Sequence, residues 1–597
     1  MSFHPNDVNR RGRAARVLVV LTIFLLVSAF FRTQVLRNNE FLLQSEGNRF
    51  REVPIPAPRG TIYDRNGRVI AENVPGYTVS LLAPNVDSLR AAMRRLGGTI
   101  TITDEMINMA VRRFRRAPNR PTAIIPDATF DVVSVLEEHR AEFPGLDIRA
   151  TPKRYYPDST AVAAFVGYTG ELNEAELEKR KAEGYKAGQQ IGKGGLELQY
   201  EVQLRGIEGV KYVEVDARGR VVREAGARSD SAAVAGKPLQ TTIDLALQKY
   251  VVDSVFADSL MGSAVVLTPE GEVVVLASVP GFDPNRFIGG IPADYWKQLQ
   301  EDPRRPLYNK ALQGVYEPGS TFKLATSVMG MAEGVMKPED RMPTPCSGGY
   351  QFGSRYFRCW DRNGHGSTTL VTAIKHSCDV YYYQLGLKLG LSRIVAGGVD
   401  LGFRERTGID LPNEQRSRYP NKPAQDYYNR LYGARNWTQA VILNLAIGQG
   451  ENAQTVINMA RFYAALATDG QLTRPHLVKH APERRRVFQL DDHQFGALVE
   501  GLKEVLRPGG TAALSAIPGI EWAGKTGTAQ NPRDPTKDHA WFAGFAPADK
   551  PRYVIVVFLE FGEHGSRAAR IASTIMKRAL GINPNAVAGL KAAGPEE

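Results

Sequence analysis

An uncharged apolar run near the N-terminus sets the strongest limit on how this chain can fold. Residues 17–31 contain no charged side chain, and Arg16 and Arg32 border them. The run is shorter than the roughly 20 residues that cross a bilayer core. However, both arginines can extend their charged ends to the headgroups, and Val35 and Leu36 can lengthen the span. We therefore expect a single transmembrane anchor over residues 17–36.

A cleavable signal peptide is the alternative, because its apolar region is about 7 to 15 residues long. No small-x-small cleavage site follows Phe31, where the chain continues with Arg32-Thr33-Gln34. This favours an uncleaved anchor. Arginines before the run favour a cytoplasmic N-terminus, so we expect residues 1–16 to be a short cytoplasmic tail. The rest of the chain then lies on the extracytoplasmic side of the inner (plasma) membrane. In a cell with two membranes, that side is the periplasm.

The length and charge of the chain limit its class. A chain of 597 residues is longer than one hydrophobic core usually serves, so we expect at least two domains. The formal net charge of +12 includes the cluster Arg112-Arg113-Phe114-Arg115-Arg116. Such clusters occur in nucleic-acid-binding proteins, but an exported domain does not meet nucleic acid, and we expect no such partner. We expect a solvated helix face there; the alternative is attraction to anionic lipid headgroups or to the carboxylates of cell-wall peptides.

Residues 37–235 mix short strands with charged helical stretches, which predicts an elongated mixed domain. Pro54, Pro56 and Pro58 predict a stiff linker near its start. The region has neither a recognisable catalytic constellation nor a phosphate-binding glycine loop. The expected strands and helices are Tyr77–Leu82, Tyr212–Val215, Asp87–Leu96 and Asn173–Glu183.

A second domain is expected over residues 236–583. Its pattern predicts an α/β (α+β) sandwich in which helices lie on both sides of a central antiparallel sheet. Residues 584–597 are rich in Pro, Ala and Gly, which predicts a disordered tail. The expected elements are helices Leu245–Asp258 and Ser566–Leu580, strands Ser263–Thr268 and Glu272–Ser278, and further strands within residues 521–561.

Ser320-Thr321-Phe322-Lys323 places a hydroxyl one helical turn from an amine, because positions i and i+3 share a helix face. Pro318 and Gly319 precede it, and few obstacles to a helix follow until Gly334, so Ser320 is predicted at a helix N-terminus, where backbone N–H groups favour negative charge. A desolvated Lys323 amine could lose its proton near neutral pH and act as general base for Ser320. Alone, so short a pattern also fits a helix start with a solvated lysine.

Two further motifs follow in chain order. Ser377-Cys378-Asp379 and Lys525-Thr526-Gly527-Thr528 complete the trio typical of serine acyltransferases that react with penicillin. The second motif lies among segments that predict adjacent antiparallel strands. A strand rich in small residues leaves its edge open to an extended peptide, which can add to the sheet by backbone hydrogen bonds. The pattern therefore predicts a peptide substrate that ends in a free carboxylate.

The chain resembles the class B penicillin-binding proteins over nearly its whole length, and most closely their elongation type, penicillin-binding protein 2. Besides the trio, the resemblance rests on residues 59–67 (RGTIYDRNG), on Gly195-Leu196-Glu197 with Tyr200, on residues 309–323 and on Gly448-Gln449-Gly450. One position departs from the family, whose middle motif is commonly Ser-x-Asn. Asp379 stands there instead; it can accept a hydrogen bond from Lys323 but has no amide N–H to donate to a substrate.

The resemblance implies a peptidoglycan D,D-transpeptidase with an elongated pedestal, a dimerisation-type domain, at 37–235 and the penicillin-binding domain at 236–583. It implies that Ser320 attacks the penultimate carbonyl of a D-alanyl-D-alanine stem peptide and that Lys323 takes its proton. Ser377 relays a proton to the leaving amine, and Lys525 and Thr526 bind the terminal carboxylate. It also implies backbone N–H donors at Ser320 and Thr528, inhibition by β-lactams, no cofactor for acyl transfer, and a SEDS-type glycosyltransferase of the elongation complex as partner.

Three other functions fit parts of the same pattern. A septal, division-type transpeptidase has the same chemistry in another assembly. An anchored, non-catalytic β-lactam sensor is also acylated by the antibiotic, although such sensors usually have several membrane spans and a cytoplasmic effector. A hydrolase, either carboxypeptidase or β-lactamase, shares the acyl-enzyme, because water and amine compete for it. Nothing in the sequence resembles the deacylating glutamate of class A β-lactamases.

All three cysteines, Cys346, Cys359 and Cys378, lie in one short segment together with His365. Three thiolates and an imidazole are the ligand set of a closed, tetrahedral structural zinc site. The alternative is a Cys346–Cys359 disulfide with Cys378 as an odd thiol, which would suit an oxidising compartment. Elongation-type relatives resemble one another in placing potential metal ligands here. Since Cys378 separates Ser377 from Asp379, a bound zinc would fix the catalytic loop.

Overall fold

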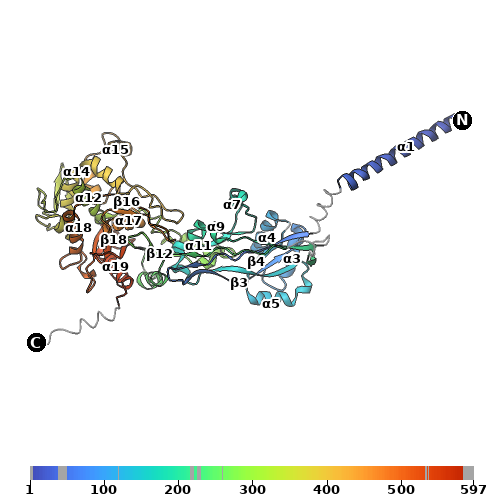
Figure 1. Cartoon of the computed structure of the whole chain (residues 1–597), viewed down its shortest axis with the longest axis horizontal. Coiled ribbons are helices and arrows are strands. Elements are labelled where there is room, and N and C mark those ends of the chain that lie inside the picture. The colour runs from blue at the N-terminus through green and yellow to red at the C-terminus, as the bar shows by residue number, and fades with distance from the viewer. Residues whose placement is uncertain are drawn as a thin grey trace.

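We describe the protein from a computed structural model. It describes residues 5–37, 50–118, 120–215, 221–224, 230–257, 260–530, 534 and 537–582, so the tail predicted over 584–597 lies outside the described residues. Figure 1 shows an elongated molecule, with helix α1 (Pro5–Phe31) at one end, an N-terminal domain in the middle and a C-terminal domain at the other end.

Helix α1 continues as a π-helical turn, Arg32–Leu36. The most apolar 18-residue window within residues 12–36 has a mean hydropathy of 2.5, and none of that window is buried in the protein. At 1.5 Å per residue these 25 residues extend over about 37 Å, which exceeds the roughly 30 Å of a hydrocarbon core. The predicted anchor segment is therefore a helix that is long and apolar enough to cross a membrane.

The N-terminal domain is built on strand β3 (Val69–Leu81). β3 pairs with β5 (Leu146–Tyr155) over ten antiparallel positions, with β2 near its start and with β4 along its second half. The strand predicted at 77–82 is the second half of β3. A separate sheet has the order β1-β8-β9. The remaining bounds are β1 (Phe50–Ile55), β2 (Ile62–Tyr63), β4 (Thr122–Ala128), β6 (Thr169–Glu171), β7 (Gln190–Gly192), β8 (Gly209–Val215), β9 (Val221–Glu224) and β10 (Leu239–Gln240).

Amphipathic helices cover this domain's sheet. In α3 (Val86–Leu96) the buried side chains are Leu89, Met93 and Leu96, one face of a helix, and the Asn85 side chain caps its first turn. The helices predicted at 87–96 and 173–183 are both present, the second as α7 and a following 3₁₀ turn. The other bounds are α4 (Asp104–Arg116), α5 (Phe130–Glu138), α6 (Ala163–Val166), α7 (Glu174–Arg180), α8 (Gly195–Gln199) and α9 (Glu201–Leu204).

Two predictions for this domain are wrong in part. Pro54 belongs to strand β1, where it pairs with Val210 of β8, instead of to a stiff linker. Proline is tolerated there because β1 is an edge strand of its sheet. The arginine cluster is only partly a solvated face: Arg113 donates to Glu171 (2.8 Å) and Arg116 to Glu174 (3.2 Å). These partners lie far along the chain, out of reach of a local sequence pattern.

A buried ionic cluster joins residues 59–67 to residues 195–200, two of the stretches that carry the family resemblance. Arg59 contacts Glu197 and donates to Glu201 (2.6 Å), and Arg154 donates to Glu197 (2.7 Å). Glu197 is fully buried, and burial alone would raise its pKa, but the charges of Arg154 and Arg59 prevail and hold its pKa below 4.5. Next to the cluster, the Tyr200 hydroxyl donates to the Asp410 carboxylate of the C-terminal domain (2.8 Å).

The substitution Glu197→Gln should destabilise the protein strongly at neutral pH. It removes the carboxylate that two buried arginines share, and breaking a buried ion pair costs roughly 3–5 kcal/mol. Chemical denaturation of the purified full chain measures this change. Because the pKa of Glu197 is lowered in the folded state, the loss is present above the unfolded pKa of about 4.3 and shrinks as the pH falls through the folded value.

The exposed pair Lys422–Asp400 provides the matched control. Asp400→Asn should change the free energy of unfolding by about 1 kcal/mol or less, since water already solvates both partners. Equal effects of the two substitutions would contradict a structural role for the buried cluster.

The C-terminal domain is built on an antiparallel sheet with the order β12-β11-β19-β18-β17. The prediction of a central antiparallel sheet is confirmed, including the strands expected within 521–561. Every residue of β11, β12 and β18 is buried, so elements cover both faces. The bounds are β11 (Gly262–Leu267), β12 (Val273–Val279), β17 (Ala523–Ala529), β18 (His539–Ala546) and β19 (Tyr553–Leu559).

Helix α19 (Gly565–Ala579) lies against β17, β18 and β19, as predicted for 566–580, and α17 (Val456–Ala467) lies against β11, β18 and β19. The helix predicted at 245–258 is α10 (Leu245–Lys249) followed by a π-helical segment to Phe256; Asp258 lies outside the described residues. Other bounds are α11 (Ala293–Glu301), α12 (Lys323–Ala332), α13 (Leu370–Lys375), α14 (Asp379–Asp400), α15 (Ala424–Tyr432), α16 (Val441–Ala446), α18 (Asp492–Glu504), β13 (Gly349–Phe352), β14 (Arg355–Arg358), β15 (Gln471–Thr473) and β16 (Arg484–Arg486).

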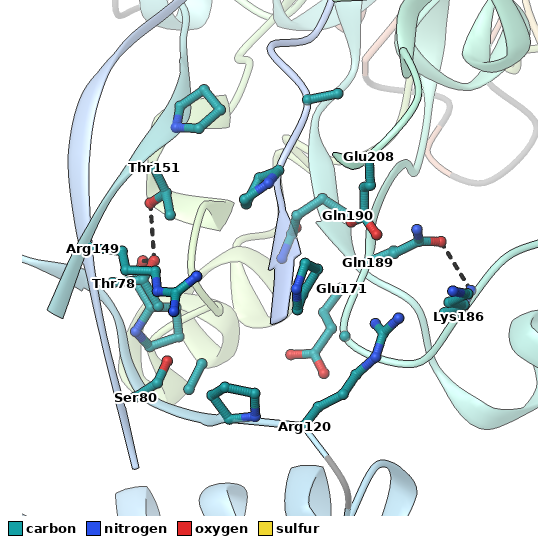
Figure 2. Close-up of a pocket in the computed structure, with 18 of the residues that line it drawn as sticks. Thr78, Ser80, Arg120, Arg149, Thr151, Glu171, Lys186, Gln189, Gln190 and Glu208 are labelled. Atoms are coloured by element: carbon teal, nitrogen blue, oxygen red, sulfur yellow. Dashed lines mark hydrogen bonds between the residues drawn. The ribbon is translucent and has the colours of Figure 1, made fainter. Parts of the chain in front are cut away.

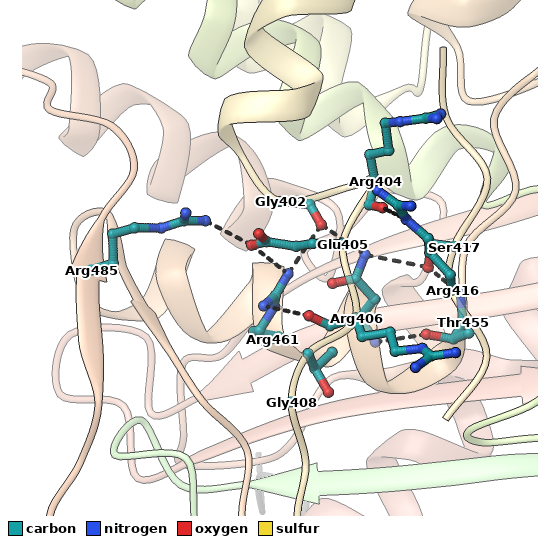
Figure 3. A network of polar contacts seen from close by, with 12 residues as sticks. Gly402, Arg404, Glu405, Arg406, Gly408, Arg416, Ser417, Thr455, Arg461 and Arg485 are labelled. Carbon is teal, nitrogen blue, oxygen red and sulfur yellow. Dashed lines mark hydrogen bonds and ion pairs between the residues drawn. The ribbon is translucent and has the colours of Figure 1, made fainter. Parts of the chain in front are cut away.

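A polar network fixes the loop that follows α14 (Figure 3). Arg461 of α17 donates to the Gly402 carbonyl (3.0 Å) and to Glu405 (3.2 Å). Arg485 of β16 donates to the same Glu405 carboxylate (2.7 Å). One carboxylate therefore ties the loop both to a helix on the central sheet and to the outer hairpin.

Candidate active site

The turn that carries Ser320 is tightly packed. Gly319–Phe322 is a 3₁₀ turn that leads into α12, so Ser320 stands just before the helix, close to the predicted position. Gly319 has φ +51°, its N–H donates to the Gly448 carbonyl (2.9 Å), and a Cβ on it would lie 2.6 Å from the Thr528 carbonyl oxygen. Only glycine fits both that backbone conformation and that approach. Ser320 itself is partly exposed between buried neighbours.

Lys323 begins α12, and its side chain has no exposed surface. Its amine donates to the Ser377 carbonyl (2.7 Å), to the Ser377 hydroxyl (3.2 Å) and to the Asp379 carboxylate (2.7 Å). The bland alternative, a solvated lysine, is therefore wrong. Since Ser320 and Lys323 are three residues apart around a helix start, the structure brings the first two motifs into one site.

The Ser377–Asp379 turn joins α13 to α14. Ser377 has φ +54°, a conformation that costs a non-glycine residue roughly 1–2 kcal/mol, and Asp379 is buried at the start of α14. Burial raises the pKa of Asp379, and the nearby Lys323 charge opposes this rise. The second carboxylate oxygen of Asp379 accepts the backbone N–H of Trp360 (3.0 Å). Both oxygens of this side chain are thus held.

Strand β17 brings the third motif to the same place. Lys525 is buried, and burial and then the charge of Lys323 lower its pKa well below the usual value. A Cβ on Gly527 would lie 2.9 Å from the Pro318 carbonyl oxygen, so only a side chain as small as hydrogen lets β17 approach the Ser320 turn. Thr526 shares a hydroxyl hydrogen bond with Thr511 (2.7 Å), and the Thr528 hydroxyl accepts from Gly565 (3.3 Å).

β17 is the last strand of its sheet. It pairs with β18 on one side, and among the described residues no strand pairs with its other edge. An extended peptide could add at that edge by backbone hydrogen bonds. The Ser320 turn lies beside the same strand, so such a peptide would lie next to the hydroxyl.

The three cysteines and His365 converge beside the β13–β14 hairpin. Their potential ligand atoms all lie within 4.8 Å of one another, and the sulfurs of Cys346 and Cys359 are each 3.6 Å from His365 Nδ1. Zinc bonds of about 2.3 Å to sulfur and 2.0 Å to nitrogen place tetrahedral ligands about 3.5 Å apart. The distances fit a metal, and all three cysteines are free, without the alternative disulfide.

The surroundings of the cluster fit a metal as well. Hydrogen bonding to Cys378 lowers the pKa of the Cys359 thiol, which favours the thiolate that a metal needs. His365 Nε2 is buried and, among the described residues, has no hydrogen-bond partner; the nearest carboxylate oxygen, on Asp361, is 4.0 Å away. A metal-binding histidine commonly directs its second nitrogen to such a carboxylate.

Two contributors to the site were not among the predicted site residues. Trp360 donates both its backbone and its indole N–H to the Ser377 turn region, and no local pattern marks it beyond its place after Cys359. Gly448 entered only through the family resemblance, yet its carbonyl accepts the N–H of Gly319. Both contacts join residues that are distant in the sequence.

A cavity of about 550 Å³ lies elsewhere, in the N-terminal domain (Figure 2). Its lining carries charges of both signs, including Arg120, Arg149, Glu171 and Lys186. None of the candidate catalytic or metal-binding residues lines it. This cavity is thus separate from the candidate site at Ser320.

Comparisons with known proteins agree with this geometry. Residues 262–577 match the model of the penicillin-binding protein transpeptidase domain, and residues 54–241 match the penicillin-binding protein dimerisation domain. The peptidoglycan D,D-transpeptidase MrdA of Acinetobacter baumannii is 32% identical, over 95% of this chain and 87% of that protein.

Two solved structures are similar over most of the chain. The penicillin-binding protein PBP2 of Helicobacter pylori, in a complex with MreC, matches with a TM-score of 0.78 and 27% identity, covering 89% of this chain and 99% of that one. PBP2 of Pseudomonas aeruginosa with WCK 5153 matches with a TM-score of 0.66 and 28% identity, covering 89% and 97%. The family predicted from the sequence is confirmed, and this chain belongs to the class B penicillin-binding proteins.

Proposed function

We propose that this chain is a membrane-anchored peptidoglycan D,D-transpeptidase that cross-links stem peptides during cell elongation. The observation that carries this proposal is the buried Lys323 amine, held by Ser377 and Asp379 one helical turn from Ser320. The relatives named MrdA favour the elongation type over the septal type. A single candidate membrane helix within the described residues does not favour a multi-span sensor.

Acylation begins when the Ser320 hydroxyl attacks the carbonyl of the penultimate D-alanine and Lys323 takes the hydroxyl proton. The backbone N–H groups of Ser320 and Thr528 stabilise the oxyanion, an effect worth about 3–4 kcal/mol per donor in comparable sites. The approach of Gly319 to the Thr528 carbonyl supports this pairing of the two backbones.

The intermediate then collapses, and its C–N bond breaks as the leaving amine gains a proton. The Ser377 hydroxyl, 3.2 Å from the Lys323 amine, passes that proton from Lys323 to the nitrogen. Free D-alanine leaves, and the acyl group stays on Ser320. Lys525 and Thr526 hold the terminal carboxylate of the substrate meanwhile. An amine of a neighbouring stem then attacks the ester, which completes the cross-link and restores the hydroxyl.

Membrane placement and partners complete the proposal. α1 anchors the chain in the inner membrane with a cytoplasmic N-terminus, as the arginines before its apolar stretch favour. A SEDS-type glycosyltransferase supplies the glycan strands, since the N-terminal domain carries no recognisable sugar-polymerising site. By analogy with the Helicobacter relative, an MreC-type protein is a further partner. β-Lactams imitate the stem terminus and stop at the acyl stage.

Ser320→Ala should abolish covalent labelling by fluorescent penicillin, because it removes the only atom that the β-lactam acylates. Gel fluorescence of the purified full chain measures this. Ser354→Ala, an exposed serine outside the site, is the matched control and should label normally. Persistent labelling of the Ser320→Ala chain would disprove the assignment of the nucleophile.

The fate of the acyl group separates transfer from hydrolysis. With lipid-linked nascent glycan as substrate and a SEDS-type polymerase present, cross-linked dimers should exceed peptides that have only lost D-alanine. Mass spectrometry of digested product measures the ratio. A product made only of trimmed peptide would instead assign the chain as a carboxypeptidase.

We also propose that Cys346, Cys359, His365 and Cys378 hold one structural zinc ion. Four protein ligands leave no open position, so the ion would supply cross-linking of the fold and no activated water. The sulfur-to-nitrogen distances of 3.6 Å and the free thiols support this. Since Cys378 lies between Ser377 and Asp379, the ion would also restrict the catalytic turn.

Metal analysis should find about one zinc per purified chain and no thiol that reacts until the protein unfolds. His365→Ala should lower the zinc content severalfold and lower the unfolding temperature, because it removes a ligand. His493→Ala changes an exposed histidine outside the cluster and should keep the full content. A disulfide in the native chain, or full zinc in the His365→Ala protein, would contradict this site.

A further inference from the structure

Trp360 is placed in a way that hydrophobic burial does not explain. It follows Cys359 directly after β14, and its side chain is 59% exposed. An exposed tryptophan gains little from the hydrophobic effect. Both of its N–H groups nevertheless have partners: the backbone N–H donates to Asp379 Oδ2 (3.0 Å), and the indole N–H donates to the His376 carbonyl (2.9 Å).

The two acceptors bracket one short turn. His376 precedes Ser377, and Asp379 follows Cys378. Ser377 between them has φ +54°. A residue in that region keeps its conformation only where its surroundings hold it. Trp360 contacts the chain on both sides of Ser377, so it holds the turn in the form that presents the Ser377 carbonyl and hydroxyl to Lys323.

Trp360 also fixes the orientation of the Asp379 carboxylate. Asp379 accepts Lys323 with one oxygen (2.7 Å) and Trp360 with the other (3.0 Å). A carboxylate held at both oxygens has a fixed plane, so the direction from which the lysine amine approaches is fixed too. The ring of His376, next to its accepting carbonyl, stacks on His365 with centroids 5.6 Å apart, which adds a second contact between the segment after β14 and the turn.

From these contacts we infer that Trp360 is a positioning residue for the acyl-transfer reaction: its indole N–H, through the His376 carbonyl, keeps the Ser377 turn aligned on Lys323. The inference rests on the proposed function. Trp360 reaches the reacting atoms only through the turn and Lys323. Its loss should therefore slow the chemical step and leave the binding of a β-lactam before acylation unchanged.

The test compares acylation kinetics of the full chain in detergent. Trp360→Phe keeps a ring and removes the indole N–H; β-(3-benzothienyl)alanine at position 360 keeps the shape and puts sulfur in place of N–H. Trp437→Phe is the matched control, because Trp437 also donates its indole N–H, to Asn429 (2.9 Å). Stopped-flow measurement with a fluorescent penicillin separates the first-order acylation rate constant from the initial dissociation constant.

Both replacements at 360 should lower the acylation rate constant about three- to tenfold, the range expected for one lost hydrogen bond. The dissociation constant and zinc content should stay unchanged, and the control should stay within about twofold of the unmodified chain. Normal acylation with benzothienylalanine would overturn the role of the N–H, as would a rate loss accompanied by an equal loss of zinc. An unmodified chain that is not acylated at all would instead sink the proposed function.

Discussion

A primary amine without contact to water governs the arrangement of the C-terminal domain. An ammonium or amine taken out of solvent must find acceptors inside the protein. Every side-chain hydrogen bond that Lys323 makes among the described residues goes to Ser377 or Asp379. Helix α12, which follows the Ser320 turn, and the turn that carries Ser377 are therefore bound to each other by one side chain. Neither can shift without leaving a buried polar group unpaired.

Close backbone packing makes the site rigid and still leaves it open to a peptide. Gly319, Gly448 and Gly527 each stand where a Cβ would strike a neighbouring backbone oxygen or carbon. Hydrogen in place of a side chain lets β17 lie against the Ser320 turn. Because β17 ends its sheet, the same approach leaves an edge at which a substrate strand can pair. These glycines thus allow close packing of the site and leave the edge of β17 accessible to a peptide.

The sequence predicted local structure where the interacting residues lie close together in the chain. The Ser320–Lys323 spacing, the amphipathic α3 and the strands of the central sheet follow from periodicity and turn residues. Long-range pairing was not readable: Pro54 joins a sheet through a partner 156 residues away, at Val210, since only the fold decides which edge is free. The same holds for Trp360, whose role depends on a turn that folds back onto it.

Buried ionised groups of the N-terminal domain lie next to its contact with the C-terminal domain. Arg59 and Arg154 both pair with the buried Glu197, and displacing either arginine would leave a buried charge without its partner. Tyr200, one helical turn after Glu197, extends this set to Asp410, which in turn accepts the backbone N–H groups of Leu477 and Val478 (2.7 and 2.9 Å). His476 bridges to Glu272, directly before β12, and Val478 bridges to Thr241, directly after β10. The orientation of the N-terminal domain is thereby specified relative to the sheet whose last strand, β17, borders the active site.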